Sequence, residues 1–238
     1  MKKIFVILFL MPILAFAATV GPQMDKWPGS VRDQESLKNG AKLFTKYCMN
    51  CHSASFMRYK NLLDIGFTEE ELRKEEMMAP DTKIGDLMMI AAKAAEQKTW
   101  FGVTPPDLTV VIRARGEAGA PKAGADWVYT YLRSFYRDAE RPTGWNNPMF
   151  DNVGMPHPLW ELQGQNELVD GKLVLTKPGT MSVEDYNKAV SDIVAFMVWM
   201  AEPQQIFRQR LGVFVLAFLV ILFGFAYALK KNYWKDVH

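Results

Sequence analysis

The chain has 238 residues, of which 49% are hydrophobic, 13% aromatic and 23% charged, and its formal net charge is +2. This composition excludes a wholly disordered chain, because it holds enough apolar surface to form a core. Neither a nucleic-acid-binding protein nor a disulfide-rich scaffold is indicated, since the sequence has no Lys/Arg-rich stripe and only 2 cysteines.

The first element in chain order is an apolar stretch at the N-terminus. Lys2-Lys3 precedes the apolar run Ile4–Leu14, and Ala15-Phe16-Ala17 follows it. A charged start, a short apolar core and an A-x-A sequence are typical of a secretory signal peptide. An N-terminal membrane anchor is the alternative, but the run is short for a membrane span. We therefore expect residues 1–18 to be a cleaved signal peptide.

A helix is predicted next, over residues 33–47, because its apolar positions recur at close to the 3.6-residue period. These positions are Leu37, Ala41, Phe44 and Cys48. Gly40 inside this helix costs about 1 kcal/mol relative to alanine, which makes sense where a second helix crosses closely. The predicted partner is a helix over residues 182–200, which has one apolar face and a serine at its start. Two unrelated amphipathic helices are the alternative.

Both cysteines follow the first helix, in the sequence Cys48-Met49-Asn50-Cys51-His52. C-x-x-C-H is the attachment signature of a c-type haem. Two thiols at this spacing reach the two vinyl groups of the porphyrin, and the adjacent histidine becomes the proximal iron ligand. A zinc site would need a second ligand pair, and a redox dithiol would not need the histidine. We predict one covalently bound haem c, held by Cys48, Cys51 and His52.

The second axial ligand must come from another part of the chain. The segment Val153–Pro158 offers both Met155 and His157, and its two prolines exclude a continuous helix. An extended loop of this kind can present one side chain to the iron, and a thioether would raise the reduction potential relative to imidazole. The residues alone leave Met155 and His157 open, with Met149 and Met181 as rivals.

The last predicted element is Leu211–Leu229, a run of 19 residues without a charge. This is about the length that a helix needs to cross the hydrocarbon layer. A buried core helix is the alternative, but such a helix rarely lacks polar residues on every face. We predict a membrane-spanning helix over residues 206–230 and a cytoplasmic tail over 231–238. The signal peptide would then place residues 19–205 in the periplasm.

Eight further segments of the chain, taken together and in this order, are more specific than the motifs above. They are Gly66–Glu71, Pro105–Thr109, Val111–Arg115, Asp126–Tyr129, Arg141–Gly144, Gly154–Pro156, Leu159–Leu162 and Phe196–Pro203. With the C-x-x-C-H sequence and the C-terminal apolar run, they resemble the cytochrome c1 family of proteobacterial type, from about Trp27 to Trp234. C-x-x-C-H alone is shared by many cytochromes, so these additional segments give the resemblance its specificity.

The resemblance implies a mostly α, cytochrome c-like haem domain with long loops, anchored by one C-terminal transmembrane helix. It implies that Met155 is the axial methionine and that one of Arg113 and Arg115 contacts a haem propionate. The expected location is the cytoplasmic membrane, as a single-pass protein with its haem domain in the periplasm.

The resemblance also implies partners. Cytochrome b and the Rieske iron–sulfur protein would share the complex, and a soluble or membrane-bound cytochrome c would accept electrons from the haem. No nucleic acid is expected, and the chain would carry out no substrate chemistry of its own.

Two other functions stay open from the residues. A free-standing membrane-anchored cytochrome, or an oxidase subunit, would share the haem and the anchor but would not need the additional segments together. A haem sensor would keep an exchangeable sixth position on the iron, which Met155 would close. Carbon monoxide binding to the reduced protein separates the sensor from the other two.

Overall fold

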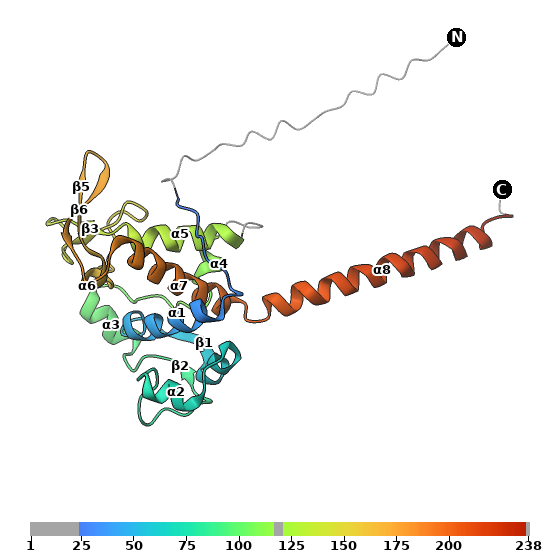
Figure 1. Cartoon of the computed structure of the whole chain (residues 1–238), viewed down its shortest axis with the longest axis horizontal. Coiled ribbons are helices and arrows are strands. Elements are labelled where there is room, and N and C mark those ends of the chain that lie inside the picture. The colour runs from blue at the N-terminus through green and yellow to red at the C-terminus, as the bar shows by residue number, and fades with distance from the viewer. Residues whose placement is uncertain (1–23, 117–120, 237–238) are drawn as a thin grey trace, which may run out of the picture.

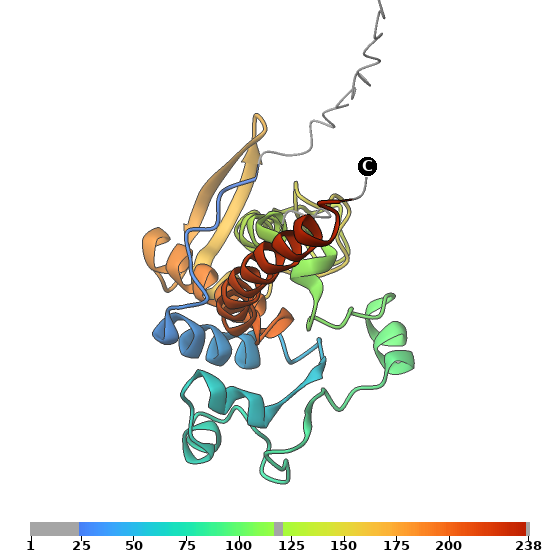
Figure 2. The same ribbon diagram turned by 90° about the vertical axis from the view of Figure 1, so that its right-hand side faces the viewer.

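The computed structural model describes residues 24–116 and 121–236, so the predicted signal peptide at residues 1–18 lies outside the described part of the chain. It shows a mainly helical head from which one long helix, α8 (Gln205–Tyr233), projects (Figure 1). Seen along α8, the head spreads around the base of that helix (Figure 2). This arrangement confirms the expected fold class, mostly α with a single C-terminal apolar helix.

Two crossed helices form the centre of the head. They are α1 (Gln34–Tyr47), whose N-terminus is capped by the side chain of Asp33, and α7 (Val183–Ala201), capped by Ser182. At the crossing, a Cβ atom on Gly40 would lie 1.9 Å from the backbone oxygen of Asp192. The close approach predicted from this glycine is therefore confirmed, and the residue is small because a backbone passes over it.

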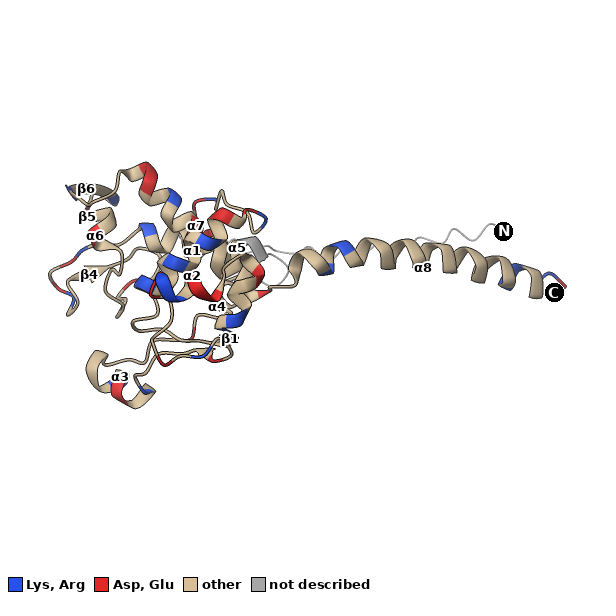
Figure 3. Ribbon diagram, turned by 60° about the horizontal axis from the view of Figure 1, so that its bottom comes forward, with Lys and Arg blue, Asp and Glu red and all other residues tan. Residues whose placement is uncertain are grey.

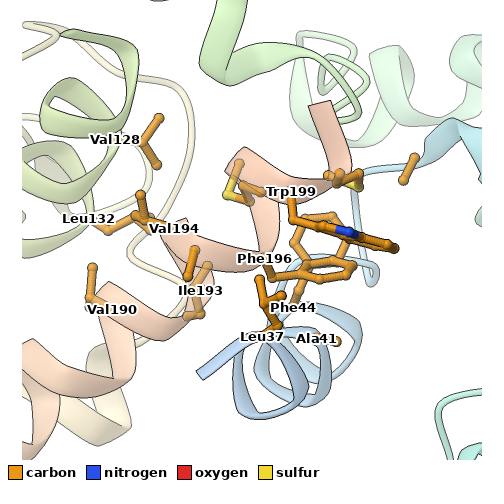
Figure 4. Packing of buried hydrophobic residues seen from close by; sticks show 14 of the residues in the cluster. Leu37, Ala41, Phe44, Val128, Leu132, Val190, Ile193, Val194, Phe196 and Trp199 are labelled. Atoms are coloured by element: carbon orange, nitrogen blue, oxygen red, sulfur yellow. The ribbon is translucent and has the colours of Figure 1, made fainter. Parts of the chain in front are cut away.

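The apolar faces of α1 and α7 meet in a continuous core (Figure 4). The rings of Phe44 and Phe196 have their centroids 5.3 Å apart, and Trp199 packs beside Phe196. A third helix, α5 (Pro121–Arg133), covers the opposite side of α7 with Val128 and Leu132 (Figure 4). The fold thus brings the residues just after α1 and those around α5 to one helical core.

Shorter elements connect these helices. The helical ones are η1 (Tyr59–Ile65), α2 (Glu69–Lys74), α3 (Ala94–Phe101), α4 (Val111–Ala114) and α6 (Trp160–Gln163). The strands pair antiparallel as β1 (Ala54–Arg58) with β2 (Leu87–Met88), β3 (Tyr136–Arg137) with β4 (Trp145–Asn146), and β5 (Gly164–Val169) with β6 (Lys172–Pro178).

None of these strands is among the predicted elements. Three of them, β2, β3 and β4, have only two residues each, which leaves no alternation to detect. The hairpin β5–β6, which stands away from the head in Figure 1, did carry a signal. Its turn is Asp170-Gly171, and both residues have positive φ, 49° and 74°. Asp-Gly at such a turn is typical of a two-residue hairpin.

Helix α8 contains the predicted membrane span. It has 29 residues and is, within the ranges 24–116 and 121–236, the one helix long and apolar enough to cross a membrane. None of its residues is buried against the head, and Lys and Arg residues occur near both of its ends but not in its middle (Figure 3). A helix that is apolar on every face and is not covered by the rest of its chain is typical of a membrane span. It therefore fits a single-pass membrane anchor.

Candidate haem-binding site

The C-x-x-C-H segment follows directly on the last turn of α1. The N–H of Cys48 still donates to the carbonyl of Phe44, at 2.9 Å, and the N–H of His52 donates back to the carbonyl of Cys48, at 3.0 Å. This turn keeps Cys48, Cys51 and His52 within a single loop of backbone. Both thiols are half-buried and form no disulfide. Two unpaired thiols beside one imidazole are what covalent haem attachment requires.

The thiol chemistry disfavours the two competing interpretations of this motif. Burial, with a smaller contribution from Cys51, raises the pKa of Cys48 to about 12. A redox dithiol reacts through its thiolate, which this environment opposes at Cys48. In addition, the described residues contain no group of three or more His, Cys, Asp or Glu side chains that could hold a metal ion.

His52 is held in the tautomer that a metal ligand needs. Its Nδ1 lies 2.7 Å from the carbonyl oxygen of Pro106. A carbonyl can only accept a hydrogen bond, so Nδ1 carries the proton and Nε2 keeps its lone pair for a metal. Burial lowers the pKa of His52, against the opposing effect of the Pro106 bond, and this favours the neutral imidazole.

The loop that supplies this carbonyl is itself fixed to the segment after the cysteines. The carboxylate of Asp107 accepts hydrogen bonds from the N–H and the hydroxyl of Ser55, both at 2.7 Å, and from the N–H of Thr109 at 2.9 Å. The N–H of Leu108 donates to the carbonyl of Ser53 at 2.9 Å. Pro105-Pro106-Asp107 therefore orients His52. Nothing in the sequence pattern of this segment indicated that role.

Gln97 is a second functional residue that sequence reasoning missed. It lies on α3, is only 4% exposed, and donates from Nε2 to the carbonyl of Cys51 at 2.6 Å. A buried amide that bonds the backbone inside the C-x-x-C-H turn stabilises its conformation. No sequence signal pointed to it, because a glutamine on a short helix whose other residues are exposed is ordinarily exposed as well.

Met155 lies on the loop between β4 and α6, beside α5. Its side chain is half-buried against the core, and its Sδ accepts a hydrogen bond from the hydroxyl of Tyr131 at 3.4 Å. Burial raises the pKa of Tyr131, with Arg115 opposing, so the phenol keeps its proton and remains a donor. The thioether is thus oriented by a neighbour and still has a second lone pair for a metal.

His157, the alternative ligand on the same loop, is packed into the core. Its ring stacks on Phe135, with centroids 4.8 Å apart and planes at 7°, and meets Trp145 edge-on at 5.1 Å. The side chain is 2% exposed, and neither ring nitrogen has a hydrogen-bond partner among the described residues. Burial lowers the pKa of His157 to about 4. The structure therefore gives His157 the role of a neutral packing residue.

The two candidate arginines face different parts of the molecule. Both belong to the single turn of α4 and its C-cap, and residues two apart on a helix do not share a face. Arg113 forms an ion pair with Glu202, which also accepts from Arg208 at 2.5 Å. Arg115 lies over the ring of Trp127, with its guanidinium carbon 4.4 Å from the centroid. Arg115 is therefore on the Met155 side, whereas Arg113 joins the head to the start of α8.

Comparison with known proteins gives one family match and several relatives. The model of the Cytochrome C1 family matches residues 25–237. A cytochrome c1 of Allochromatium vinosum is 43% identical over the whole of both chains. A protein of Nitrosomonas europaea named ammonia monooxygenase gamma subunit is 45% identical, over 100% of this chain and 98% of that protein. A cytochrome b/c1 of Bradyrhizobium diazoefficiens is 27% identical, over 91% of this chain and 36% of its own length.

Proposed function

Because the chain belongs to the cytochrome c1 family, we propose that it is a membrane-anchored cytochrome that carries electrons from a Rieske iron–sulfur protein to a cytochrome c within a bc1 complex. Its cofactor is haem c, bound covalently, which supplies reversible one-electron chemistry. The observation that carries the proposal is the C-x-x-C-H turn, where two unpaired thiols adjoin an imidazole whose Nδ1 is fixed by Pro106.

The residues around this turn fit the cofactor. Cys48 and Cys51 would form the two thioether bonds, and Nε2 of His52 and Sδ of Met155 would be the axial ligands. Each of these side chains is held by a hydrogen bond that leaves its metal-binding lone pair free. His52 is held through Nδ1 by the carbonyl of Pro106, and Met155 through one lone pair of Sδ by the hydroxyl of Tyr131. Ligands fixed in this way move little when the charge on the iron changes, which favours fast electron transfer.

Membrane attachment supports the same function. Helix α8 would hold the head at the bilayer surface, in the periplasm if the predicted signal peptide exports it. Anchoring beside fixed partners raises their effective concentration, so transfer does not depend on diffusion from solution. The name of the Bradyrhizobium relative, cytochrome b/c1, supports cytochrome b as one of those partners.

The proposal is tested by purifying the tagged chain from membranes in mild detergent. We expect cytochrome b and the Rieske protein to co-purify, and the preparation to reduce cytochrome c in the presence of a quinol. Recovery of the haem-loaded chain alone, or with subunits of an oxidase or of ammonia monooxygenase in place of cytochrome b, would overturn it. Rapid carbon monoxide binding to the reduced protein would instead favour a haem sensor.

Covalent attachment is tested at the second cysteine. Cys51→Ala removes one thiol while Cys48 and His52 stay, so we expect haem held by one thioether, with less of it retained. Mass spectrometry of the haem-bearing peptide measures the attachment, and the spectrum of the pyridine complex reports the extra unsaturated vinyl group. Ser53→Ala, two residues further on, is the control and should keep both bonds. An unchanged pyridine spectrum in Cys51→Ala would contradict the assignment.

The two arginines give a matched pair of variants. We propose that Arg115, rather than Arg113, offsets the charge of a haem propionate, because it lies over Trp127, whose ring stacks on Tyr131, the hydrogen-bond donor to Met155. Arg115→Gln should lower the midpoint potential by on the order of tens of millivolts, since loss of a nearby positive charge disfavours the reduced, less positive state. Arg113→Gln should change it less, because that charge faces Glu202. Redox titration showing the reverse order would reject this choice.

A further inference from the structure

We propose that Tyr131 is a positioning residue for the thioether of Met155 and that its hydroxyl raises the reduction potential of the site. The inference rests on the proposed function, in which Met155 is the second axial ligand. The observation behind it is the hydrogen bond from the phenol of Tyr131 to Sδ of Met155, with 3.4 Å between oxygen and sulfur.

The Tyr131 ring is fixed by its neighbours on α5 and just beyond it. It stacks on Trp127, one helical turn earlier, with centroids 4.8 Å apart and planes at 14°. It also meets Phe135, with centroids 5.1 Å apart and planes at 65°. A ring packed against two aromatic neighbours has little freedom to swing away from the sulfur, so the hydroxyl has a defined direction.

The same set of rings holds the methionine loop at a second point. Phe135 stacks face to face on His157, two residues after Met155. The loop is thus attached to the α5 region twice, at Met155 by a hydrogen bond and at His157 by stacking. Between Phe135 and Trp145 the ring of His157 serves as a flat packing surface, with Gln163 as the polar side chain next to it.

The chemical consequence follows from the two lone pairs of a thioether sulfur. One pair is available to a metal, and the other can accept the phenol proton in a hydrogen bond. Such a bond draws electron density from the sulfur and weakens its donation. A weaker electron donor stabilises ferric iron less relative to ferrous iron, so the reduction potential rises.

A purely structural role for Tyr131 is distinguishable from this one. Tyr131→Phe removes the hydroxyl and keeps the ring that stacks on Trp127 and Phe135. Tyr186→Phe is the matched control, because that residue is also buried, at 2% exposed against 9% for Tyr131, and its hydroxyl donates to the carbonyl of Leu132 at 2.7 Å and not to Met155. If buried phenols mattered only for packing and stability, the two variants would behave alike.

The experiment uses the full-length, haem-loaded protein in detergent. Midpoint potentials are measured by redox titration, and sulfur ligation by the weak red absorption band of ferric haem with a sulfur ligand. We expect Tyr131→Phe to keep the band and lower the potential, while Tyr186→Phe keeps both and lowers only the melting temperature. An unchanged potential in Tyr131→Phe, or an equal fall in Tyr186→Phe, would overturn the proposal.

A third variant keeps this result separate from the ligand assignment. Met155→Leu removes the sulfur altogether and should abolish the band. Persistence of the band in Met155→Leu would show that Met155 is not the ligand, and the proposed site would then fail whatever Tyr131→Phe does. Loss of the band in Met155→Leu with no change of potential in Tyr131→Phe would leave the ligand assignment intact and reject only the role of Tyr131.

Discussion

Met155→His is expected to keep the covalent haem but to lower its midpoint potential by on the order of 0.2 V, a substantial part of the roughly 0.8 V range that axial ligands span. The thioether is a weak donor that favours ferrous iron, whereas imidazole is a stronger donor that stabilises ferric iron. The change also removes the acceptor of the Tyr131 hydrogen bond, which acts in the same direction. Redox titration of the purified protein measures the shift.

The rival methionines are the controls for this prediction. Met149 and Met181 are partly buried and pack against the same core, so each is a comparable perturbation of the head. Met149→His and Met181→His should leave the potential close to that of the unmodified protein. A fall in either of them, with no change in Met155→His, would move the ligand to that position.

Gly40→Ala is expected to destabilise the head by about 2 kcal/mol. Alanine gains about 1 kcal/mol over glycine in helix propensity. Its Cβ, however, would lie 1.9 Å from the backbone oxygen and 2.5 Å from the carbonyl carbon of Asp192. Overpacking in a core costs about 1–3 kcal/mol, and we expect the upper limit because the obstacle is backbone and cannot rotate aside. The steric cost therefore exceeds the propensity gain.

Helix α7 is also prevented from sliding away. The carboxylate of Asp192 accepts hydrogen bonds from Ser36 and Asn39 on α1, both at 2.6 Å, and from Lys188 at 3.0 Å. Moving α7 away from α1 would relieve the contact made by Gly40→Ala but would stretch these hydrogen bonds, so the steric strain cannot be relieved without a further loss of stability.

Thermal unfolding followed by circular dichroism checks the Gly40→Ala prediction, with the melting temperature expected to fall by about 4–8 °C. Gly212 provides the control, since it is a helical glycine in α8 where an added Cβ would meet no other heavy atom within 4 Å. Gly212→Ala should leave the melting temperature of the head unchanged. If Gly40→Ala were as stable as the unmodified protein, α1 and α7 would have to lie further apart at this crossing than the 1.9 Å between the added Cβ and the backbone oxygen of Asp192 implies.

The chain's local patterns predicted its main elements. The 3.6-residue period predicted α1 and α7, and Gly40 predicted that another helix passes closely over α1. The uncharged run Leu211–Leu229 lies inside α8, and C-x-x-C-H predicted the haem c that the family carries. These signals were legible because each depends on residues close together in the sequence.

Roles that depend on distant residues could not be predicted in this way. The carbonyl of Pro106 that orients His52 is 54 positions away, and the hydroxyl of Tyr131 is 24 positions from the sulfur of Met155. No periodicity or spacing encodes such a pair. The difference between Arg113 and Arg115 is of the same kind, because only packing decides that one meets Glu202 and the other Trp127.

The sequence by itself determined the attachment chemistry, the helical core and the apolar anchor, since covalent spacing and hydrophobic period are local properties of the chain. Only the tertiary structure decided which polar groups orient the two candidate ligands. These hydrogen bonds and ring stacks join elements that are distant in the sequence. Their partners are therefore fixed by the packing of α1, α5 and α7 and not by neighbours in the chain.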